Sequence, residues 1–314
     1  MPEVVTMGET MAVMAPTEPG PLRYVASYRL RMAGAESNLA VGLCKLGHTA
    51  GWISRLGDDE MGRFVLNAVR AEGVDTRFVR WDDAHRTGLM LKEMGARETR
   101  VYYYRENSAA SRLDEDALDE EYLKGASVLH LTGITPVLSE SCARAADRAA
   151  QLAEKHGVPL SFDPNIRKKL WQGRDYRERL RRLLFSARIA LLGVQEAEEL
   201  LGTGEPEAVV RLLREKGAEW IALKNGAEGA WVADRNTLEK IPPFPCRAVD
   251  PIGAGDAFNA GFLAGILEGR GVADCGRMGC IAGAMATETP GDVEGLPSRQ
   301  QLLMHLENRQ ETFR

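Results

Sequence analysis

The chain has 314 residues, of which 44% are hydrophobic and 27% are charged, a composition typical of a soluble globular protein with a sizeable core. Its formal net charge of −5 is small, which gives no electrostatic reason to expect a nucleic-acid partner or an acidic membrane surface. No apolar run approaches the roughly 20 residues that a membrane-spanning helix requires. The five cysteines form no CxxC pair, and no basic stretch followed by an apolar one begins the chain, so we expect a cytoplasmic protein with reduced thiols.

Short strand-like segments alternate with helical patterns along most of the chain. Residues 36–46 carry leucines at the i, i+4, i+7 spacing of a helix. A second helix is predicted over 139–155, with Gly157 as its stop. This alternation predicts a parallel sheet covered by helices on both faces. The predicted strands lie at residues 3–9, 50–57, 127–133, 158–164, 188–193 and 219–226.

Residues 10–33 and 87–107 break this alternation. Each holds strand-like pieces separated by Pro, Gly or Arg, with no helical pattern. We expect these two segments to form a small antiparallel excursion from the α/β core. The core would then consist of residues 1–9, 34–86 and 108–314.

The run TRVYYYRENSA, residues 99–109, lies at the end of the second segment. Tyrosine favours strands, and side chains in a strand alternate between its two faces. Tyr103 and Arg105 would therefore share one face, while Tyr102 and Tyr104 would share the other. An exposed aromatic patch often marks an interface, so we expect Tyr102 and Tyr104 to pack against a second copy of the chain in a homo-oligomer.

The segment VDPIGAGDAFNAGFLAGIL, residues 249–267, contains the motif most closely tied to chemistry. Gly253, Ala254 and Gly255 directly precede an apolar helical pattern, and small residues let a backbone approach a ligand closely. The free N–H groups and the positive end of the following helix form an anion site. Asp256, in the first turn, is either a partner for the helix dipole or a general base aimed at a hydroxyl.

This segment resembles the C-terminal signature of the ribokinase-like (PfkB) carbohydrate kinases. AGAESNLAVGLCKLG, residues 33–47, is similar to their N-terminal signature, and the resemblance extends to about Pro297. It implies a three-layer α/β/α core with a small β-sheet lid, which fits the two segments that break the alternation. It also implies ATP and Mg²⁺ as cofactors and raises a monovalent cation as a third.

Within that family, further segments resemble the 2-keto-3-deoxygluconate kinases. This likeness implies transfer of the γ-phosphoryl group of ATP to the terminal hydroxyl of 2-keto-3-deoxy-D-gluconate, which gives the 6-phosphate. Asp256 would accept the hydroxyl proton, and the backbone of residues 253–255 would stabilise the developing charge. The segments are GAESN (34–38), YYRENSA (103–109), LHLTGITP (129–136), DPNIRKKLW (163–171) and GDVEGLP (291–297).

The resemblance assigns sugar contacts to positions in several segments. Two of them are arginines, which bind carboxylates through paired, charge-assisted hydrogen bonds. Met90 departs from the pattern, because a tyrosine is expected there in close relatives. The implied positions are Gly34, Ala35, Glu36, Asn38, Tyr103, Arg105, Arg167, Asp256 and Asp292.

A second set of positions is implied for the nucleotide and its metal. Glu196 corresponds to the acidic residue that organises magnesium, in an indirect role. Gly193 replaces the Asn of the usual Asn-x-x-Glu motif, although Mg²⁺ usually retains waters and needs few carboxylates. The nucleotide positions are Asn165, Arg167, Lys224, Gly226, Gly229, Gly253, Ala254 and Gly255.

Three alternatives remain open. Another kinase of the family would act on fructose, ribose or a nucleoside, and a neutral sugar would leave Arg105 and Arg167 without a carboxylate. A dinucleotide-dependent oxidoreductase would also use glycine turns, but no GxGxxG follows the first strand. A non-catalytic sugar sensor is disfavoured by the retained Asp256 and glycine run.

Overall fold

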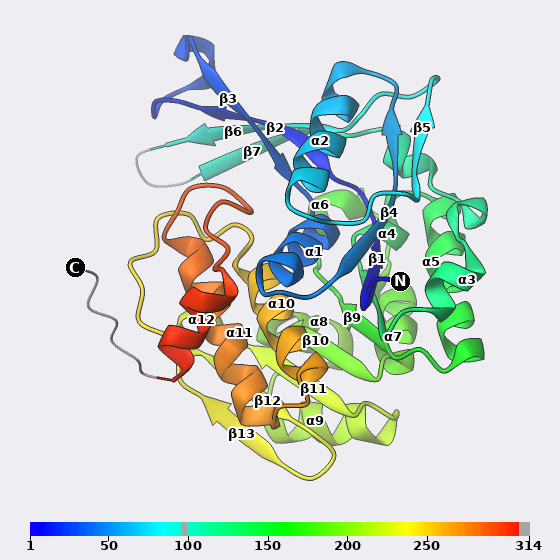
Figure 1. Cartoon of the computed structure of the whole chain (residues 1–314), viewed down its shortest axis with the longest axis vertical. Helices are drawn as coiled ribbons and strands as arrows, with labels where there is room; N and C mark the ends of the chain where they lie inside the picture. Colours follow the sequence, from blue (N-terminus) through cyan, green and yellow to red (C-terminus); the bar gives the residue numbers. More distant parts are fainter. Residues whose placement is uncertain (96–98, 308–314) are drawn as a thin grey trace.

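The computed structural model describes residues 1–95 and 99–307. In those ranges, nine strands form a main sheet in the order β13-β12-β11-β10-β9-β8-β1-β4-β5 (Figure 1). Neighbouring strands from β5 to β11 pair in parallel. The strands are β1 (Val4–Met7), β4 (Ala50–Gly57), β5 (Val79–Asp82), β8 (Val128–Thr132), β9 (Leu160–Asp163), β10 (Ile189–Gly193), β11 (Trp220–Lys224), β12 (Ala230–Ala233) and β13 (Leu238–Ile241).

The predicted α/β architecture is confirmed, with one correction at the edge of the sheet. Each of the six predicted strands corresponds to a strand of the main sheet, namely β1, β4, β8, β9, β10 and β11. However, β12 pairs antiparallel with both β11 and β13, so the sheet is mixed and not wholly parallel. The chain turns back after β11 through the short turn at Gly226–Glu228, and a tight turn reverses the strand direction where a helical crossover would preserve it.

Helices cover both faces of the main sheet. The helices α1, α2, α10 and α11 bury their apolar side chains on one face, and α5, α7, α8 and α9 bury theirs on the other. Strand residues alternate accordingly, since Val4 joins the first cluster and Val5 the second. None of the helices in the described ranges is long and apolar enough to cross a membrane. The helices are α1 (Ala35–Lys45), α2 (Glu60–Ala71), α3 (Glu120–Lys124), α4 (Thr135–Leu138), α5 (Glu140–His156), α6 (Lys168–Trp171), α7 (Arg177–Ser186), α8 (Val194–Leu201), α9 (Pro206–Glu215), α10 (Ala254–Leu267), α11 (Val272–Thr287) and α12 (Arg299–Leu306).

The two helices predicted in detail are confirmed to within one residue at each end. α1 and α5 occupy the predicted segments. At the start of α5, the Ser139 hydroxyl accepts a hydrogen bond from the backbone N–H of Cys142 at 3.1 Å. At its end, Gly157 adopts a left-handed φ of 69°, a conformation that glycine enters at little cost.

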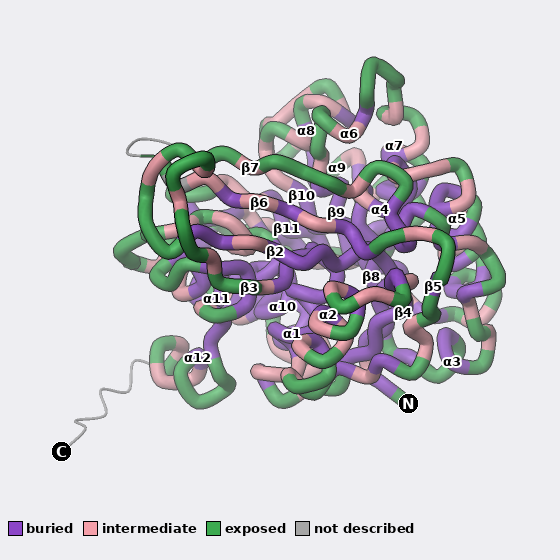
Figure 2. Tube along the Cα trace, turned by 90° about the horizontal axis from the view of Figure 1, so that it is seen from above, coloured by how far each residue is buried: buried purple, intermediate pink, exposed green. Residues whose placement is uncertain are grey.

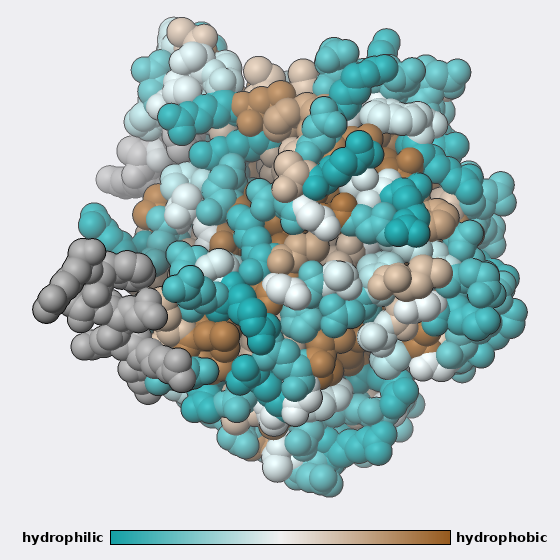
Figure 3. All heavy atoms as spheres, viewed as in Figure 1, coloured by the Kyte–Doolittle hydropathy of each residue, from teal (hydrophilic) through white to brown (hydrophobic). Residues whose placement is uncertain are grey.

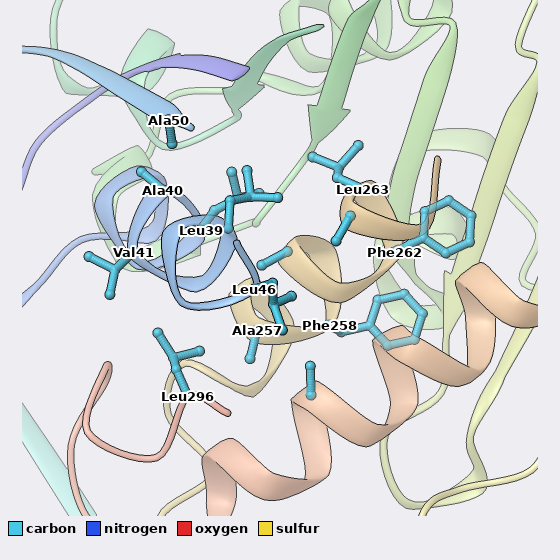
Figure 4. Packing of buried hydrophobic residues seen from close by; sticks show 14 of the residues in the cluster. Leu39, Ala40, Val41, Leu46, Ala50, Ala257, Phe258, Phe262, Leu263 and Leu296 are labelled. Carbon is cyan, nitrogen blue, oxygen red and sulfur yellow. The ribbon is translucent and has the colours of Figure 1, made fainter. Parts of the chain in front are cut away.

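Helices α1 and α10 pack against each other in the core, and Figure 4 shows Leu39 of α1 on the side that faces α10. A Cβ atom at Gly42 of α1 would lie only 2.7 Å from the Cβ of Ala260 in α10, so the missing side chain permits this close approach. Asn38 and Asp256 each lie one helical turn before these residues, on the same side of the contact. The glycine in α1 therefore helps to bring Asn38 and Asp256 together.

A second, smaller sheet lies beside the main domain, in the order β3-β2-β6-β7 (Figure 1). Its strands are β2 (Met11–Pro16), β3 (Tyr28–Ala33), β6 (Leu89–Met94) and β7 (Thr99–Tyr104). The sheet was expected to be antiparallel, but β2 and β6 pair in parallel. The chain leaves this sheet after β3 and returns only after β5 of the main sheet, so the direction of β6 is not set by a hairpin with β2.

Strand alternation gives the small sheet two different faces. Met11, Val13 and Met90 lie on the inner face, where they form a buried cluster with Ala33. Leu30 and Tyr102 lie on the opposite, outer face, and Figure 2 shows that the residues of their strands, β3 and β7, are exposed along much of the length. Only the inner face is therefore placed to contribute to a site shared with the main domain.

Candidate active site

A cavity of about 660 Å³ lies between the small sheet and the carboxyl ends of the main-sheet strands. Its lining includes Asp163 at the end of β9, Lys224 at the end of β11 and the first turn of α10. Open α/β sheets bind their ligands at this edge. The inner face of the small sheet contributes Met11, Met90 and other residues to the same lining.

Asp256 lies buried beside this cavity, in the first turn of α10. Its Oδ2 accepts a hydrogen bond from Asn38 Nδ2 at 2.8 Å, and its Oδ1 accepts one from Asn165 Nδ2 at 3.3 Å. Burial is the main cause that raises the pKa of Asp256 to about 7; the charges of Asp163 and Asp292 act in the same direction, and the hydrogen bond from Asn38 opposes them. A carboxylate with this pKa is suited to accept a proton near neutral pH.

The backbone before Asp256 has the geometry expected for the predicted anion site. Gly253 caps α10 with a left-handed φ of 83°, and a Cβ atom there would lie 2.9 Å from the backbone oxygen of Asp292. Both constraints require glycine. The first turn of α10 presents N–H groups that have no helical acceptor, together with the positive end of the helix dipole.

Behind Asp256, a buried ion pair joins three elements of the core. Lys224 Nζ lies 2.7 Å from Asp163 Oδ2 and donates to Asn259 Oδ1 at 3.1 Å. Burial alone would raise the pKa of Asp163, but the Lys224 ammonium holds it below its usual value. The ion pair fixes the ends of β9 and β11 relative to α10.

The first turn of α1 contributes a second buried carboxyl group. Oε1 of Glu36 accepts hydrogen bonds from the hydroxyls of Thr132 and Thr135 at 2.7 and 2.8 Å. Burial raises the pKa of Glu36, and its Oε2 has no hydrogen-bond partner among the described residues. Glu36 lines the cavity together with Gly34 and Ala35, so the predicted sugar-binding turn is placed at the cavity wall.

Tyr103 and Arg105 also line the cavity, on the side of the small sheet. The guanidinium of Arg105 forms an ion pair with Glu9, which also accepts a hydrogen bond from Ser108 Oγ. Arg105 Nε is buried and has no acceptor among the described residues. Arg105 is thus partly neutralised by the protein and keeps one free donor.

Arg167 is the second predicted arginine of the cavity wall. Its side chain is exposed, and no acceptor for it is recorded within residues 1–95 and 99–307. Its positive charge acts on Asp256, whose pKa it lowers. This position leaves the Arg167 guanidinium free to meet an anionic group that enters the cavity.

Comparison with known proteins identifies the family. Residues 1–299 match the family described as pfkB family carbohydrate kinase. The chain belongs to the PfkB carbohydrate kinases. It is 37% identical to a 2-dehydro-3-deoxygluconokinase of Bacillus subtilis (strain 168), over 97% of this chain and 95% of that protein. It is 33% identical to a 2-dehydro-3-deoxygalactonokinase of Haloferax volcanii, over 93% of this chain and 95% of that protein.

A solved structure shows the same fold. A putative ribokinase II from E. coli, in complex with ATP and Mg²⁺, superposes with a TM-score of 0.91 at 24% sequence identity, covering 98% of this chain and 100% of that one. The main sheet, the small sheet and the cavity between them therefore belong to a PfkB sugar kinase, which is a phosphotransferase. The resemblance noted from the two signature segments is confirmed at the level of the family.

The donor groups of this kinase fit an indirect role for magnesium. Glu196, in the first turn of α8, accepts backbone N–H bonds from Gly193 at 2.7 Å and Ile166 at 2.8 Å. Burial raises the pKa of Glu196, and the Asp163 charge adds to this effect. Among the described residues no group of three or more ligating side chains is placed to hold a metal directly. Mg²⁺ commonly rests on phosphates and keeps its waters, so water-mediated contact with Glu196 is compatible with this arrangement.

Three predicted nucleotide residues do not line the cavity: Ala254, which lies between the lining residues Gly253 and Gly255, and the two glycines after β11. Gly226 belongs to the turn after β11, and Gly229 precedes β12 with a φ of 88°. Neither is among the residues that line the cavity, whereas Lys224, Gly253 and Gly255 are. To reach Gly226 and Gly229, a bound nucleotide would have to extend from the cavity along the surface.

Sequence reasoning assigned no role to three charged residues around the site, although Asp250 was part of the glycine motif. Glu9 follows β1, at the edge of the sheet where ligands bind. Its place at the end of a predicted strand could have indicated that it lies near the site. Lys92 lies two residues after Met90 and thus on the inner face of the small sheet, where its Nζ lies 2.8 Å from Asp250 Oδ2. Asp250 opens the glycine motif, but its partner is distant in the sequence and no local pattern predicts the pair.

Proposed function

We propose that this PfkB kinase transfers the γ-phosphoryl group of ATP to the terminal hydroxyl of 2-keto-3-deoxy-D-gluconate, which gives the 6-phosphate. We choose this sugar because two arginines lie on the cavity wall. The Arg167 side chain makes no hydrogen bond or ion pair within the described ranges, and Arg105 keeps a buried Nε donor. A neutral sugar would offer no anion to Arg167 and no charged acceptor to the Nε of Arg105, whereas a sugar acid supplies one carboxylate. The similarity to the Bacillus subtilis relative supports the same assignment.

The roles of the other residues follow from their positions. Asp256 takes the proton from the terminal hydroxyl while the oxygen of that hydroxyl attacks the phosphorus atom in line. The N–H groups of residues 253–255 stabilise charge on the transferred group. Asn38 and Asn165 hold the carboxylate of Asp256 in one orientation. Magnesium, when bound, neutralises part of the phosphate charge, and Glu196 would orient one of its waters.

The remaining proposals concern the small sheet and its surroundings. Residues 10–33 and 87–107 act as a lid that excludes water from the cavity and limits hydrolysis of ATP. Residues 1–9, 34–86 and 108–314 form the core that binds sugar and nucleotide.

A requirement for a monovalent cation stays a prediction. All five cysteines are free thiols, which supports a cytoplasmic location.

The outer face of the small sheet supports the proposal of a homo-oligomer. An apolar row crosses its four strands, because Leu30 pairs with Met14, Met14 with Leu91, and Leu91 with Tyr102. The exposed fractions of Leu30, Tyr102 and Tyr104 are 40%, 42% and 63%. In Figure 3, hydrophobic atoms lie near the small sheet at the top of the view and also at several places over the main domain, among mostly hydrophilic atoms. We propose that a second copy of the chain covers this row.

The substrate is tested by measuring ADP release with a panel of acceptors. The panel holds the gluconate and galactonate forms of the 2-keto-3-deoxy acid, fructose, ribose and a nucleoside. We expect the highest kcat/KM for the gluconate form. A preference for the galactonate form would change the epimer and keep the sugar-acid class. A preference for any neutral acceptor would overturn the assignment to a sugar acid.

A further inference from the structure

A buried lysine connects the small sheet to the phosphate-transfer site. Lys92, in β6, is only 5% exposed. Its Nζ lies 2.8 Å from Asp250 Oδ2 and 3.6 Å from Asp292 Oδ1. An ammonium group removed from water requires compensating charge, and these two carboxylates supply it. They belong to two different loops of the core.

Backbone N–H groups of both loops donate further hydrogen bonds to the Asp250 carboxylate. Asp250 accepts backbone N–H bonds from Ile252 at 3.2 Å and from Gly291 at 3.3 Å. The second bond crosses from the loop that precedes α10 to the loop that precedes α12. The Lys92 ammonium therefore lies at the junction of the two loops.

The junction reaches Asp256 by two short routes. Asn38 Nδ2 lies 3.4 Å from Asp292 Oδ2 and 2.8 Å from Asp256 Oδ2, so one amide group contacts both carboxylates. The second route is steric, because Gly253 packs against the backbone of Asp292. A shift of Asp292 would therefore move both the proton acceptor and the start of the anion site.

Repulsion between the two carboxylates is a second reason for a cation at the junction of the two loops. Burial and the neighbouring Asp250 and Glu294 raise the pKa of Asp292, while Lys92 lowers it. Without Lys92, the carboxylates of Asp250 and Asp292 would face each other beside a site that must accept polyphosphate. The ammonium thus removes repulsion both within the junction and toward the nucleotide.

We propose that Lys92 is a positioning residue of the kinase reaction. Its ammonium group fixes the two loops so that Gly253 and Asp256 take their productive positions when the small sheet lies on the core. The proposal rests on the phosphotransferase activity of the family and not on which sugar is used. The assay therefore uses whichever acceptor in the panel gives the fastest ADP release with the wild-type enzyme.

The first experiment compares Lys92→Met with Arg31→Met. Arg31 is the matched control, because it also joins the small sheet to the core, through Glu294 at 3.1 Å and the backbone oxygen of Pro290. Arg31 makes no hydrogen bond or ion pair with Asp250 or Asp292. We expect Lys92→Met to lower kcat about 100-fold, the size of effect that a displacement of about 1 Å produces. Arg31→Met should raise the KM for the sugar and leave kcat within about threefold of the wild type.

The second experiment restores the missing cation. Lys92→Ala opens space beside Asp250, and ammonium or methylammonium chloride should raise its kcat at least fivefold, with tetramethylammonium chloride as the ionic-strength control. If Lys92→Met does not fold, as judged by circular dichroism, Lys92→Gln removes the charge and keeps a hydrogen-bond donor. Three results would each overturn the proposal: an unchanged kcat without the Lys92 charge, an equal loss of kcat in Arg31→Met, or no response of Lys92→Ala to ammonium.

Discussion

At the scale of single residues, the buried carboxylate of Asp256 is needed for activity but lowers the stability of the folded chain. The carboxyl group must be ionised to accept a proton, yet burial raises its pKa to about 7. We therefore expect kcat/KM to fall tenfold per pH unit below about pH 7.

Asp256→Asn should lower kcat at least about 10³-fold, with little change in ATP binding measured by calorimetry. A variant with near-normal turnover would exclude Asp256 as the proton acceptor.

The same shift predicts a gain in stability when the charge is removed. At pH 8 Asp256 is ionised in both the folded and the unfolded chain, and ionisation costs more in the folded chain because the pKa there is raised from 3.8 to about 7. This cost is absent below the unfolded pKa and grows as the pH rises through the interval between the two values. Asp256→Asn should stabilise the protein at pH 8 by up to about 4 kcal/mol, and by much less at pH 4. Urea unfolding at the two pH values measures the difference.

The two arginines of the cavity differ in how far the protein already neutralises them. Arg105 is paired with Glu9, whereas Arg167 has no acceptor recorded in the described part of the chain. We expect Arg167→Ala to raise the KM for a sugar acid by about 10- to 100-fold, in line with the loss of a hydrogen bond to a charged group. Lys169→Ala is the matched control, since Lys169 is another exposed cation of the cavity wall. Equal effects of both changes would indicate general electrostatic attraction and no specific contact.

At the scale of elements, the start of α10 depends on the left-handed backbone of its cap. Gly253→Ala places a Cβ atom 2.9 Å from the Asp292 backbone oxygen, in a residue whose φ is 83°. We expect it to cost about 1–3 kcal/mol of stability and to lower kcat. Gly271→Ala is the matched control, because Gly271 caps α11 with a φ of −65° and nothing lies within 4 Å of its added Cβ. Similar losses in both variants, measured by thermal unfolding, would contradict this role of Gly253.

At the scale of the whole molecule, the outer face of the small sheet decides the expected state of association. The apolar row of Leu30, Met14, Leu91 and Tyr102 should be covered by a second copy, so sedimentation should give a mass above the 34.5 kDa of one chain. Leu30→Glu should shift the protein toward the monomer, because a buried unpaired charge opposes association. Tyr24→Glu is the control, as Tyr24 is 74% exposed and lies outside the four strands. A wild-type protein that stays monomeric at high concentration would exclude this interface.

The sequence by itself determined the features that depend on local patterns. Alternating apolar runs and helical spacing specified the α/β core, α1 and α5, because side-chain period and capping act within a few residues. The glycine run and Asp256 were also visible, since a helix start and its small residues are adjacent in the chain. Family signatures then indicated the kind of reaction.

Only the tertiary structure decided which distant residues meet. The parallel pairing of β2 with β6 and the antiparallel edge of β12 and β13 depend on the path of the chain between the strands. Glu9 pairs with Arg105, and Lys92 with Asp250, across 96 and 158 positions of sequence respectively. Such pairs form because burial makes each charge costly unless an opposite charge lies beside it. No local pattern carries that requirement, so the partners of the charged residues became known only when the small sheet was placed against the core.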